Sequence, residues 1–430
     1  MKFKVFSLGC KVNSYECSAL ASKLISLGYT QDDKNPDVII INTCSVTATA
    51  DQKSRQHIRK FMKMYPNAIS VVMGCYSQGN YKYIEEEIKP NILIGTKYRS
   101  SIPDYINNYL STKTNIVKVD ENTRKYEYEE LGITSYTENV RAYLKIQDGC
   151  NNFCTYCIIP YRRGQMRSRK LENVIEEAKY LIKQGYKEII LTGIHVGGYG
   201  QDVDGVTFAE LVDQLSSLEG LSSLRISSIE ASEIDSRLID LIKNRSNIAK
   251  HLHIPLQAGS DEILRRMNRK YTSSEFVEKI KLIRKEIPDV GITTDIIVGF
   301  PGETDKDFED TCRVARECFD QIHVFPYSAR EGTPAARFPN QVSPQVKSSR
   351  VSALMSISNE LHNAFKEKMV GKTMKALIEK YDDENDINYG KLTNYVEIEL
   401  KGLHSNQVGN EINVKIEKKY DWIEIIFIFL

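Results

Sequence analysis

Short apolar runs alternate with helix-length segments six times between residues 143 and 325. The runs are typical of buried strands, and the segments between them repeat apolar residues with the period of a helix. We predict strands at 143–147, 188–191, 224–228, 251–256, 292–298 and 322–325. We predict helices at 171–184, 208–218, 236–244, 261–267, 274–286 and 305–318. Six successive βα units favour a parallel sheet that closes partly or wholly into a barrel, with its chemistry at the carboxyl ends of the strands.

A loop rich in cysteine follows the first of these strands. It contains Cys150, Cys154 and Cys157, with three and then two residues between them. Three thiolates can hold an iron–sulfur cluster and leave one iron without a protein ligand. A structural zinc site normally has four protein ligands, and the next histidine along the chain is His195. The spacing therefore favours a cluster with an open iron over an incomplete zinc site or unrelated cysteines.

The amino-terminal part of the chain repeats the alternation of strand and helix. Strand-like runs occupy residues 3–8, 38–41 and 69–73. Helical segments at 14–27 and 48–64 lie between them. This order predicts an open parallel α/β sheet, in which the carboxyl ends of the strands share one edge.

A cysteine follows each of these three runs, namely Cys10, Cys44 and Cys75. Because the strand ends share one edge, we expect the three thiols to form a second three-thiolate site. The alternative is that they are small buried residues, as cysteines often are. We assign the cysteines within helical segments to packing: Cys17, Cys312 and Cys318. Isolated histidines such as His195 and His253 are more often satisfied core groups than catalysts.

The carboxyl-terminal part begins with a predicted helix at 343–368 and then becomes rich in strands. We predict these strands at 374–379, 391–400, 411–418 and 422–428. Short strands joined by polar turns predict a small β-barrel. A polar and charged stretch at 111–139 indicates a linker. The domains that follow from these boundaries are 1–115, 136–366 and 368–430.

The net charge constrains the partners of the chain. A formal charge of +1 gives no broad attraction to nucleic acid, so any contact with RNA would come from local patches. Two basic runs could supply phosphate contacts: Arg162, Arg163, Arg167, Arg169 and Lys170 in the first, and Arg265, Arg266, Arg269 and Lys270 in the second. The alternative for both runs is a solvated charged face.

The cysteine content indicates the compartment. Nine cysteines without a secretory signal are typical of the reducing cytoplasm, where clustered thiols are more often metal ligands than disulfides. The apolar run at 423–430 is too short to span a membrane. We expect a cytoplasmic monomer without a membrane partner.

The combination of two separated cysteine triads resembles the radical S-adenosylmethionine methylthiotransferase family over nearly the whole chain. The loop from Cys150 to Cys157, with Tyr156 before its last cysteine, is similar to the radical cysteine motif of this family. The segments around Cys10, Cys44 and Cys75 are similar to its amino-terminal domain, which carries a second cluster. The sequences of residues 9–13, 145–160 and 167–169 look most like those of the branch that modifies threonylcarbamoyladenosine beside the tRNA anticodon.

The resemblance implies the cofactors S-adenosylmethionine and two [4Fe–4S] clusters. The catalytic cluster would be held by Cys150, Cys154 and Cys157, and the second cluster by Cys10, Cys44 and Cys75. The first would cleave S-adenosylmethionine to a radical that takes hydrogen from C2 of the adenine at position 37, and the second would supply sulfur. By analogy, the residues that contact the cofactor would be Gly193, Ser228, Glu230 and Gln257. The implied partners are the anticodon loop of tRNA and an electron donor such as a flavodoxin or ferredoxin.

The same resemblance leaves other functions open. A methylthiotransferase acting on isopentenyladenosine in tRNA, or on an aspartate of a ribosomal protein, would share both triads. A non-catalytic electron carrier would hold clusters but would not need a barrel of six βα units. The family ends in a small RNA-binding barrel called TRAM, and residues 393–395 resemble its central strand. Acidic residues outnumber basic ones after Gly371, which argues against strong phosphate binding there.

Overall fold

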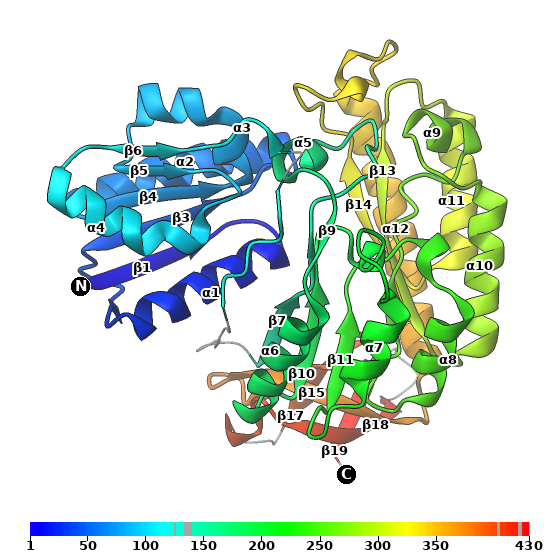
Figure 1. Cartoon of the computed structure of the whole chain (residues 1–430). Coiled ribbons are helices and arrows are strands. Elements are labelled where there is room, and N and C mark those ends of the chain that lie inside the picture. Colours follow the sequence, from blue (N-terminus) through cyan, green and yellow to red (C-terminus); the bar gives the residue numbers. More distant parts are fainter. Residues whose placement is uncertain (124–125, 133–139, 402–404, 420–423, 430) are drawn as a thin grey trace.

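Three sheets organise the chain, and Figure 1 shows the first beside a curved second sheet, with the third across one end of the second. The computed structural model describes all residues except 124–125, 133–139, 402–404, 420–423 and 430. Among the described residues, no helix combines the length and apolar character needed to cross a membrane.

The first sheet is parallel and has the strand order β2-β1-β3-β4-β5-β6. Its strands are β1 (Lys2–Ser7), β2 (Thr30–Gln31), β3 (Val38–Thr43), β4 (Ile69–Gly74), β5 (Ile92–Ile94) and β6 (Ile116–Lys118). Its helices are α1 (Lys11–Ser26), α2 (Ala48–Met64), α3 (Cys75–Tyr83) and α4 (Ile102–Thr112). Alternate residues of β3 pack into two different apolar clusters, because helices cover both faces of the sheet.

Sequence patterns predicted only the three longest strands of this sheet. Residues 116–118, expected in a linker, form edge strand β6 and pair with β5. That part of the linker prediction is wrong because β2, β5 and β6 contain two or three residues each, too few to show a period. The parallel α/β class itself is confirmed.

Six parallel strands form the second sheet in the order β7-β10-β11-β12-β13-β14. They are β7 (Arg141–Lys145), β10 (Glu188–Thr192), β11 (Ser223–Ile226), β12 (His251–His253), β13 (Gly291–Val298) and β14 (Gln321–Pro326). Isolated bridges at Leu224–Ile248 and Ser228–His253 join its two three-stranded halves. Within the described residues, β7 and β14 each pair with one neighbour, so the barrel is partial.

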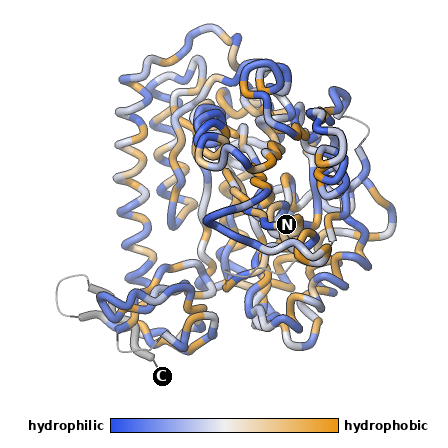
Figure 2. Tube along the Cα trace, turned by 90° about the vertical axis from the view of Figure 1, so that its left-hand side faces the viewer, coloured by the Kyte–Doolittle hydropathy of each residue, from blue (hydrophilic) through white to orange (hydrophobic). Residues whose placement is uncertain are grey.

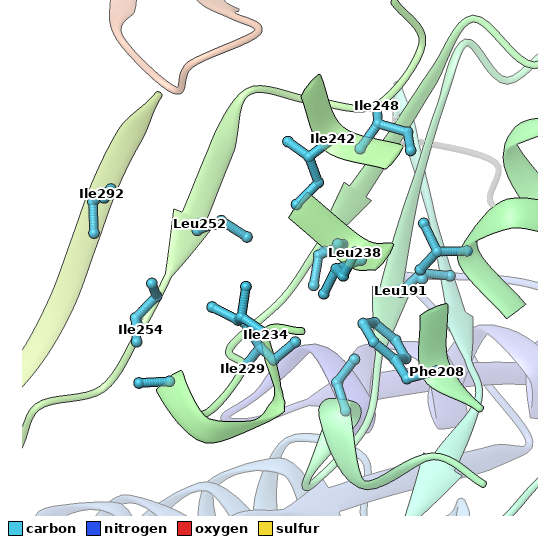
Figure 3. Close-up of a cluster of buried hydrophobic side chains, with 14 of the residues drawn as sticks. Leu191, Phe208, Ile229, Ile234, Leu238, Ile242, Ile248, Leu252, Ile254 and Ile292 are labelled. Carbon is cyan, nitrogen blue, oxygen red and sulfur yellow. The ribbon is translucent and has the colours of Figure 1, made fainter. Parts of the chain in front are cut away.

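Helices cover the outer face of this sheet. They are α6 (Leu171–Lys183), α7 (Phe208–Ser216), α8 (Ser236–Asn244), α10 (Ser273–Glu286) and α11 (Asp305–Cys318). The short helix α9 (Asp261–Arg266) packs in a separate cluster with Phe300 and Tyr327. Figure 3 shows how Leu191 and Leu252 from the strands meet Phe208 and Leu238 from the helices in one buried cluster. The predicted βα alternation is therefore confirmed.

The third sheet follows the long helix α12 (Pro344–Lys368). It is antiparallel, curls into half a barrel, and has the order β17-β16-β15-β18-β19. Its strands are β15 (Thr373–Asp382), β16 (Ile387–Leu392), β17 (Glu397–Lys401), β18 (Glu411–Lys419) and β19 (Glu424–Phe429). The two views together place it at the end of the molecule that carries the C-terminus, away from the first sheet (Figures 1 and 2).

One predicted strand of this sheet is wrong. Residues 391–400 are not a single strand but a hairpin, because the chain turns at Thr393–Tyr395 between β16 and β17. The turn packs against the start of the barrel strands, where the Tyr395 ring stacks on His251 with centroids 4.3 Å apart. A Cβ atom added to Gly291 would lie 2.2 Å from the Asn394 carbonyl oxygen, so the contact requires glycine at that position.

A buried ion pair fixes α12 to the barrel. An Arg350 guanidinium nitrogen lies 2.5 Å from a Glu303 carboxylate oxygen, and both side chains are almost completely buried. Arg350→Ala would leave the Glu303 charge unpaired, so we expect the free energy of unfolding to fall by about 3–5 kcal/mol in urea titrations. The control is Arg316→Ala, which removes an exposed pair with Glu360 and should cost about 1 kcal/mol or less. Equal losses would contradict the structural role of Arg350.

Candidate cluster-binding site

Backbone hydrogen bonds hold the cysteine loop between β7 and α6 at both of its ends. The Cys150 N–H donates to the Gly164 carbonyl at 3.1 Å, and the Cys157 N–H donates to the Cys154 carbonyl at 2.9 Å. Thr155 lies between them and bonds to the end of α9, through its N–H to Met267 and its hydroxyl to Arg266. The loop that carries the three sulfur atoms is therefore bonded to Gly164 and to the end of α9.

The Gln147 side chain connects the start of this loop to the turn after β10 by hydrogen bonds. Its side-chain amide donates to the carbonyls of Asp148 and Gly149 at 2.8 and 2.6 Å. Its side-chain oxygen accepts from the N–H groups of Ile194 and His195 at 3.0 and 2.8 Å. The side chain is fully buried and all of its hydrogen-bonding groups face backbone partners.

Charged side chains from later turns of the barrel lie beside this triad. An Arg269 N–H donates to the Cys154 sulfur at 3.6 Å, and the same guanidinium pairs with Glu230. His195 Nε2 lies 2.5 Å from a Glu233 oxygen. Burial alone would lower the pKa of His195, but hydrogen bonds to Cys150 and Glu233 outweigh burial and raise the pKa to about 10. A small cavity of about 60 Å³ lies among Cys154, His195, Glu230, Glu233, Arg269 and Tyr271.

The first-domain cysteines lie at the carboxyl ends of neighbouring strands. Cys10 precedes α1, Cys44 follows β3, and Cys75 is the first residue of α3. A Cβ atom on Gly9 would approach the Cys44 sulfur to 2.5 Å, so the turn before Cys10 packs directly on Cys44. Gly9 also has φ +97°, a conformation that favours glycine. The three cysteines therefore lie at one edge of the first sheet, as the sequence predicted.

The chemistry of both donor sets fits iron–sulfur clusters. Burial raises the pKa of the Cys75 thiol to about 11 and that of the Cys157 thiol to about 12, so without a metal these thiols stay protonated. Thiolate ligation requires the proton to leave, and arginine cations at Cys75 and Cys154 compensate the charge that remains.

The proposed cofactor residues occupy the same end of the barrel. Glu230 lines the cavity beside Cys154, and an added Cβ atom at Gly193 would lie 3.0 Å from the Gln147 side chain. Ser228 bridges to β12, and Gln257 bridges to Ile296 of β13 with φ +68°. The structure brings Glu230 and Gly193 to the cysteine loop, and it sets Ser228 and Gln257 on the adjacent strand ends.

Most of the first basic run is neither a phosphate patch nor a solvated face. Arg163, Arg167 and Arg169 are buried in ion pairs. Arg163 pairs with Glu16 of the first domain, Arg167 pairs with Asp148, and Arg169 pairs with Glu130 and with Glu177 of the helix that follows it. Both readings of these three arginines are wrong, because a local run of charge carries no information about partners distant in sequence.

The second basic run contains one arginine at the protein surface and one beside the cysteine loop. Arg265 is exposed and pairs with Glu262 of its own helix, whereas Arg269 is buried against Cys154 and Glu230. Sequence reasoning missed Arg269, His195 and Glu233 as site residues. Arg269 was singled out only as a possible phosphate contact and His195 only as a core histidine, and Glu233 had no signal beyond its position after a barrel strand, which many other residues share.

The remaining predictions concern single residues. Cys17 and Cys318 are buried, as expected, and Cys312 packs against the barrel core. His253 is not an isolated core group: its Nε2 lies 3.3 Å from Asp295, and its ring stacks with that of His323 at 5.5 Å.

Two known families match this chain. Residues 144–315 match the radical SAM superfamily, and residues 2–95 match the uncharacterized protein family UPF0004. The threonylcarbamoyladenosine tRNA methylthiotransferase MtaB of Bacillus subtilis is 42% identical over 419 residues, covering 96% of this chain and 93% of that protein. The tRNA-2-methylthio-N(6)-dimethylallyladenosine synthase of Pelotomaculum thermopropionicum is 38% identical, covering 89% of this chain and 87% of that protein.

A solved structure supports the fold. The radical S-adenosylmethionine methyltransferase TsrM from Kitasatospora setae superposes with a TM-score of 0.58 at 13% identity, covering 78% of this chain and 73% of that one. Likeness at this identity concerns the arrangement of helices and strands alone.

Replacement of Gln147 by leucine tests how the cysteine loop is held. The variant leaves two N–H and two C=O groups without their side-chain partner, so we expect a loss of about 1–3 kcal/mol in unfolding free energy. Amide exchange at Ile194 and His195 should accelerate, as measured by hydrogen–deuterium exchange. The control, Gln184→Leu, changes an exposed residue at the end of α6 and should alter neither quantity. Unchanged exchange in the Gln147 variant would refute this role.

Proposed function

Because the chain belongs to the radical S-adenosylmethionine methylthiotransferase family, we propose that it adds a methylthio group to C2 of N6-threonylcarbamoyladenosine at position 37 of tRNA. It is an enzyme whose cofactors are S-adenosylmethionine and two [4Fe–4S] clusters. The choice of nucleoside rests on one observation. Full-length similarity is higher to the Bacillus subtilis MtaB, at 42%, than to the Pelotomaculum dimethylallyladenosine synthase, at 38%.

We assign the two clusters to the two cysteine triads. Cys150, Cys154 and Cys157 would hold the radical cluster, and Cys10, Cys44 and Cys75 the second one. When bound, the clusters supply the electron that cleaves S-adenosylmethionine and the site for the transferred sulfur. The burial of Cys44, Cys75 and Cys154 and the cations at Cys154 and Cys75 support this assignment.

The residues around the first triad would receive S-adenosylmethionine. Glu230, held by Arg269, could accept hydrogen bonds from the cofactor, and the absence of a side chain at Gly193 leaves space beside Gln147. Ser228 and Gln257 would contact the same ligand from neighbouring strand ends. Glu233 and Gln147 set the position of His195 beside Cys150.

The three sheets would belong to three domains, 1–115, 136–366 and 368–430, with β6 added to the end of the first. The anticodon loop of tRNA would enter where the first domain meets the carboxyl ends of the barrel strands. A flavodoxin or ferredoxin would deliver the electron, and the protein would act as a monomer in the cytoplasm, where its RNA substrate occurs.

The nucleoside itself can be tested by complementation. We expect expression of this chain in a host lacking its own threonylcarbamoyladenosine methylthiotransferase to restore 2-methylthio-N6-threonylcarbamoyladenosine, measured by mass spectrometry of digested tRNA. Cys154→Ala, which removes one radical-cluster ligand, should restore none. Appearance of 2-methylthio-dimethylallyladenosine instead, in a host lacking that synthase, would favour the alternative substrate and refute the proposal.

The cluster assignment predicts iron content. Anaerobic reconstitution should give about eight irons per chain, and replacing Cys150, Cys154 and Cys157 together by alanine should give about four. Cys154→Ala alone should abolish reductive cleavage of S-adenosylmethionine to 5′-deoxyadenosine. The matched control is Cys312→Ala, a half-buried cysteine of α11 outside both triads, which should keep both iron and cleavage. Unchanged cleavage in the Cys154 variant would exclude the assigned radical site.

A further inference from the structure

Arg163 connects the two cysteine triads through a single side chain. It is the last residue of α5 (Ile159–Arg163), a short helix that begins two residues after Cys157. Its side chain is fully buried and extends into the first domain. There its Nε–H donates to the Cys75 sulfur at 3.2 Å. An arginine from the loop of one triad therefore hydrogen-bonds directly to a sulfur of the other.

The rest of the guanidinium also has partners. One terminal nitrogen donates to Glu16 at 2.8 Å and to Asp148 at 3.1 Å. The other donates to the Asn13 side-chain oxygen at 2.9 Å and to Glu16 at 3.2 Å. The planar fork of the guanidinium is thereby fixed, which aims Nε at Cys75.

Asn13 extends this contact to the other two cysteines of the first domain. Its side-chain nitrogen donates to the carbonyl oxygens of Leu8 and Thr43, at 2.7 and 3.1 Å. These carbonyls lie two residues before Cys10 and one residue before Cys44. Arg163 thus touches one cysteine directly and holds, through Asn13, the backbone that carries the other two.

Within the described part of the chain, the ion pairs around Arg163 include one more cation than carboxylate, so a thiolate could pair with the remaining positive charge. Among the residues that the structure describes, four cations pair with three carboxylates in this buried junction: Arg99, Lys145, Arg163 and Arg167 with Glu16, Glu129 and Asp148. A buried cation without a matching anion is costly, whereas a thiolate at Cys75 would complete the pairing. The junction therefore suits a ligated, deprotonated Cys75.

We infer that Arg163 is a positioning residue that raises the reduction potential of the amino-terminal cluster by its hydrogen bond and charge at Cys75. Hydrogen bonds to the sulfurs and local charge set cluster potentials. Reduction adds negative charge to the cluster, so a cation and an N–H donor at a ligand stabilise the reduced form. This inference rests on the proposed ligation of the second cluster by Cys75.

The test measures the potential of that cluster alone. In the full-length Cys150→Ala, Cys154→Ala, Cys157→Ala background, iron analysis first establishes whether the amino-terminal cluster binds. An EPR-monitored redox titration then compares Arg163 with Arg163→Gln. We expect the glutamine variant to lower the reduced-to-oxidised ratio at a fixed potential by about tenfold, which is 59 mV for one electron. Arg163→Lys, which keeps the charge, should recover part of the shift.

Arg99→Gln is the matched control. Arg99 is equally buried and pairs with the same Glu16 and Asp148, but it makes no hydrogen bond to a cysteine among the described residues. Its shift should be clearly smaller than that of Arg163→Gln. An unchanged potential in Arg163→Gln with full iron content, or an equal shift in Arg99→Gln, would overturn the inference. Failure of the parent background to bind iron would instead refute the proposed ligation.

A second measurement leaves Arg163 in place and covers the case in which its variants do not fold. The same background is prepared with ¹⁵N-labelled arginine and its reduced cluster is studied by pulsed EPR. We expect coupling to an arginine nitrogen and to an exchangeable proton, since Arg163 donates to Cys75 in the native arrangement. The absence of both couplings would also overturn the inference.

Discussion

The buried ion pairs between the first domain and the barrel are the constraint on which the site depends. Glu16 of α1 and Asp148, beside the cysteine loop, are almost completely buried and share cations from both domains. Such groups are stable only when paired, because removing one partner leaves a buried charge. Burial would raise the pKa of both carboxyls, but the nearby arginines and Lys145 hold each pKa below its usual range. The two domains therefore cannot separate without exposing or unpairing several charges.

This junction brings together the strand ends of the two domains that carry the cysteines. In parallel sheets the carboxyl ends collect loops on one side, and here two such sides face each other. Arg330, which follows β14, completes the contact by bonding to Ser45 and Asp51 just beyond Cys44. One triad thus lies close to the other although more than seventy residues separate Cys75 from Cys150. A reaction that needs both a radical and a sulfur donor requires this proximity.

The parts of the fold set by local periodicity were predictable. The six barrel strands and their helices follow from apolar repeats. Cys10, Cys44 and Cys75 were singled out by their places after three strands of the first sheet, and Cys150, Cys154 and Cys157 by their spacing after β7. Pairing over long distances was not predictable: nothing near Arg163 indicates Glu16 or Cys75 as partners. The hairpin at Thr393–Tyr395 was missed because it contains no glycine or proline, and Tyr395 adopts φ +77° where a turn would favour glycine.

The same hairpin packs the carboxyl-terminal sheet against the barrel. It closes the end of the barrel where the strands begin, opposite to the cysteine loop, and the Arg225 guanidinium lies over the Tyr395 ring at 5.3 Å. Arg225 also donates to the Thr393 carbonyl, while Glu379 of β15 pairs with Arg141. Acidic and aromatic groups of the sheet thus meet cations at the start of the barrel. At this contact the sheet therefore presents a carboxylate and an aromatic ring to barrel cations, whereas Asp383, Glu384 and Asp386 in the turn between β15 and β16 are exposed.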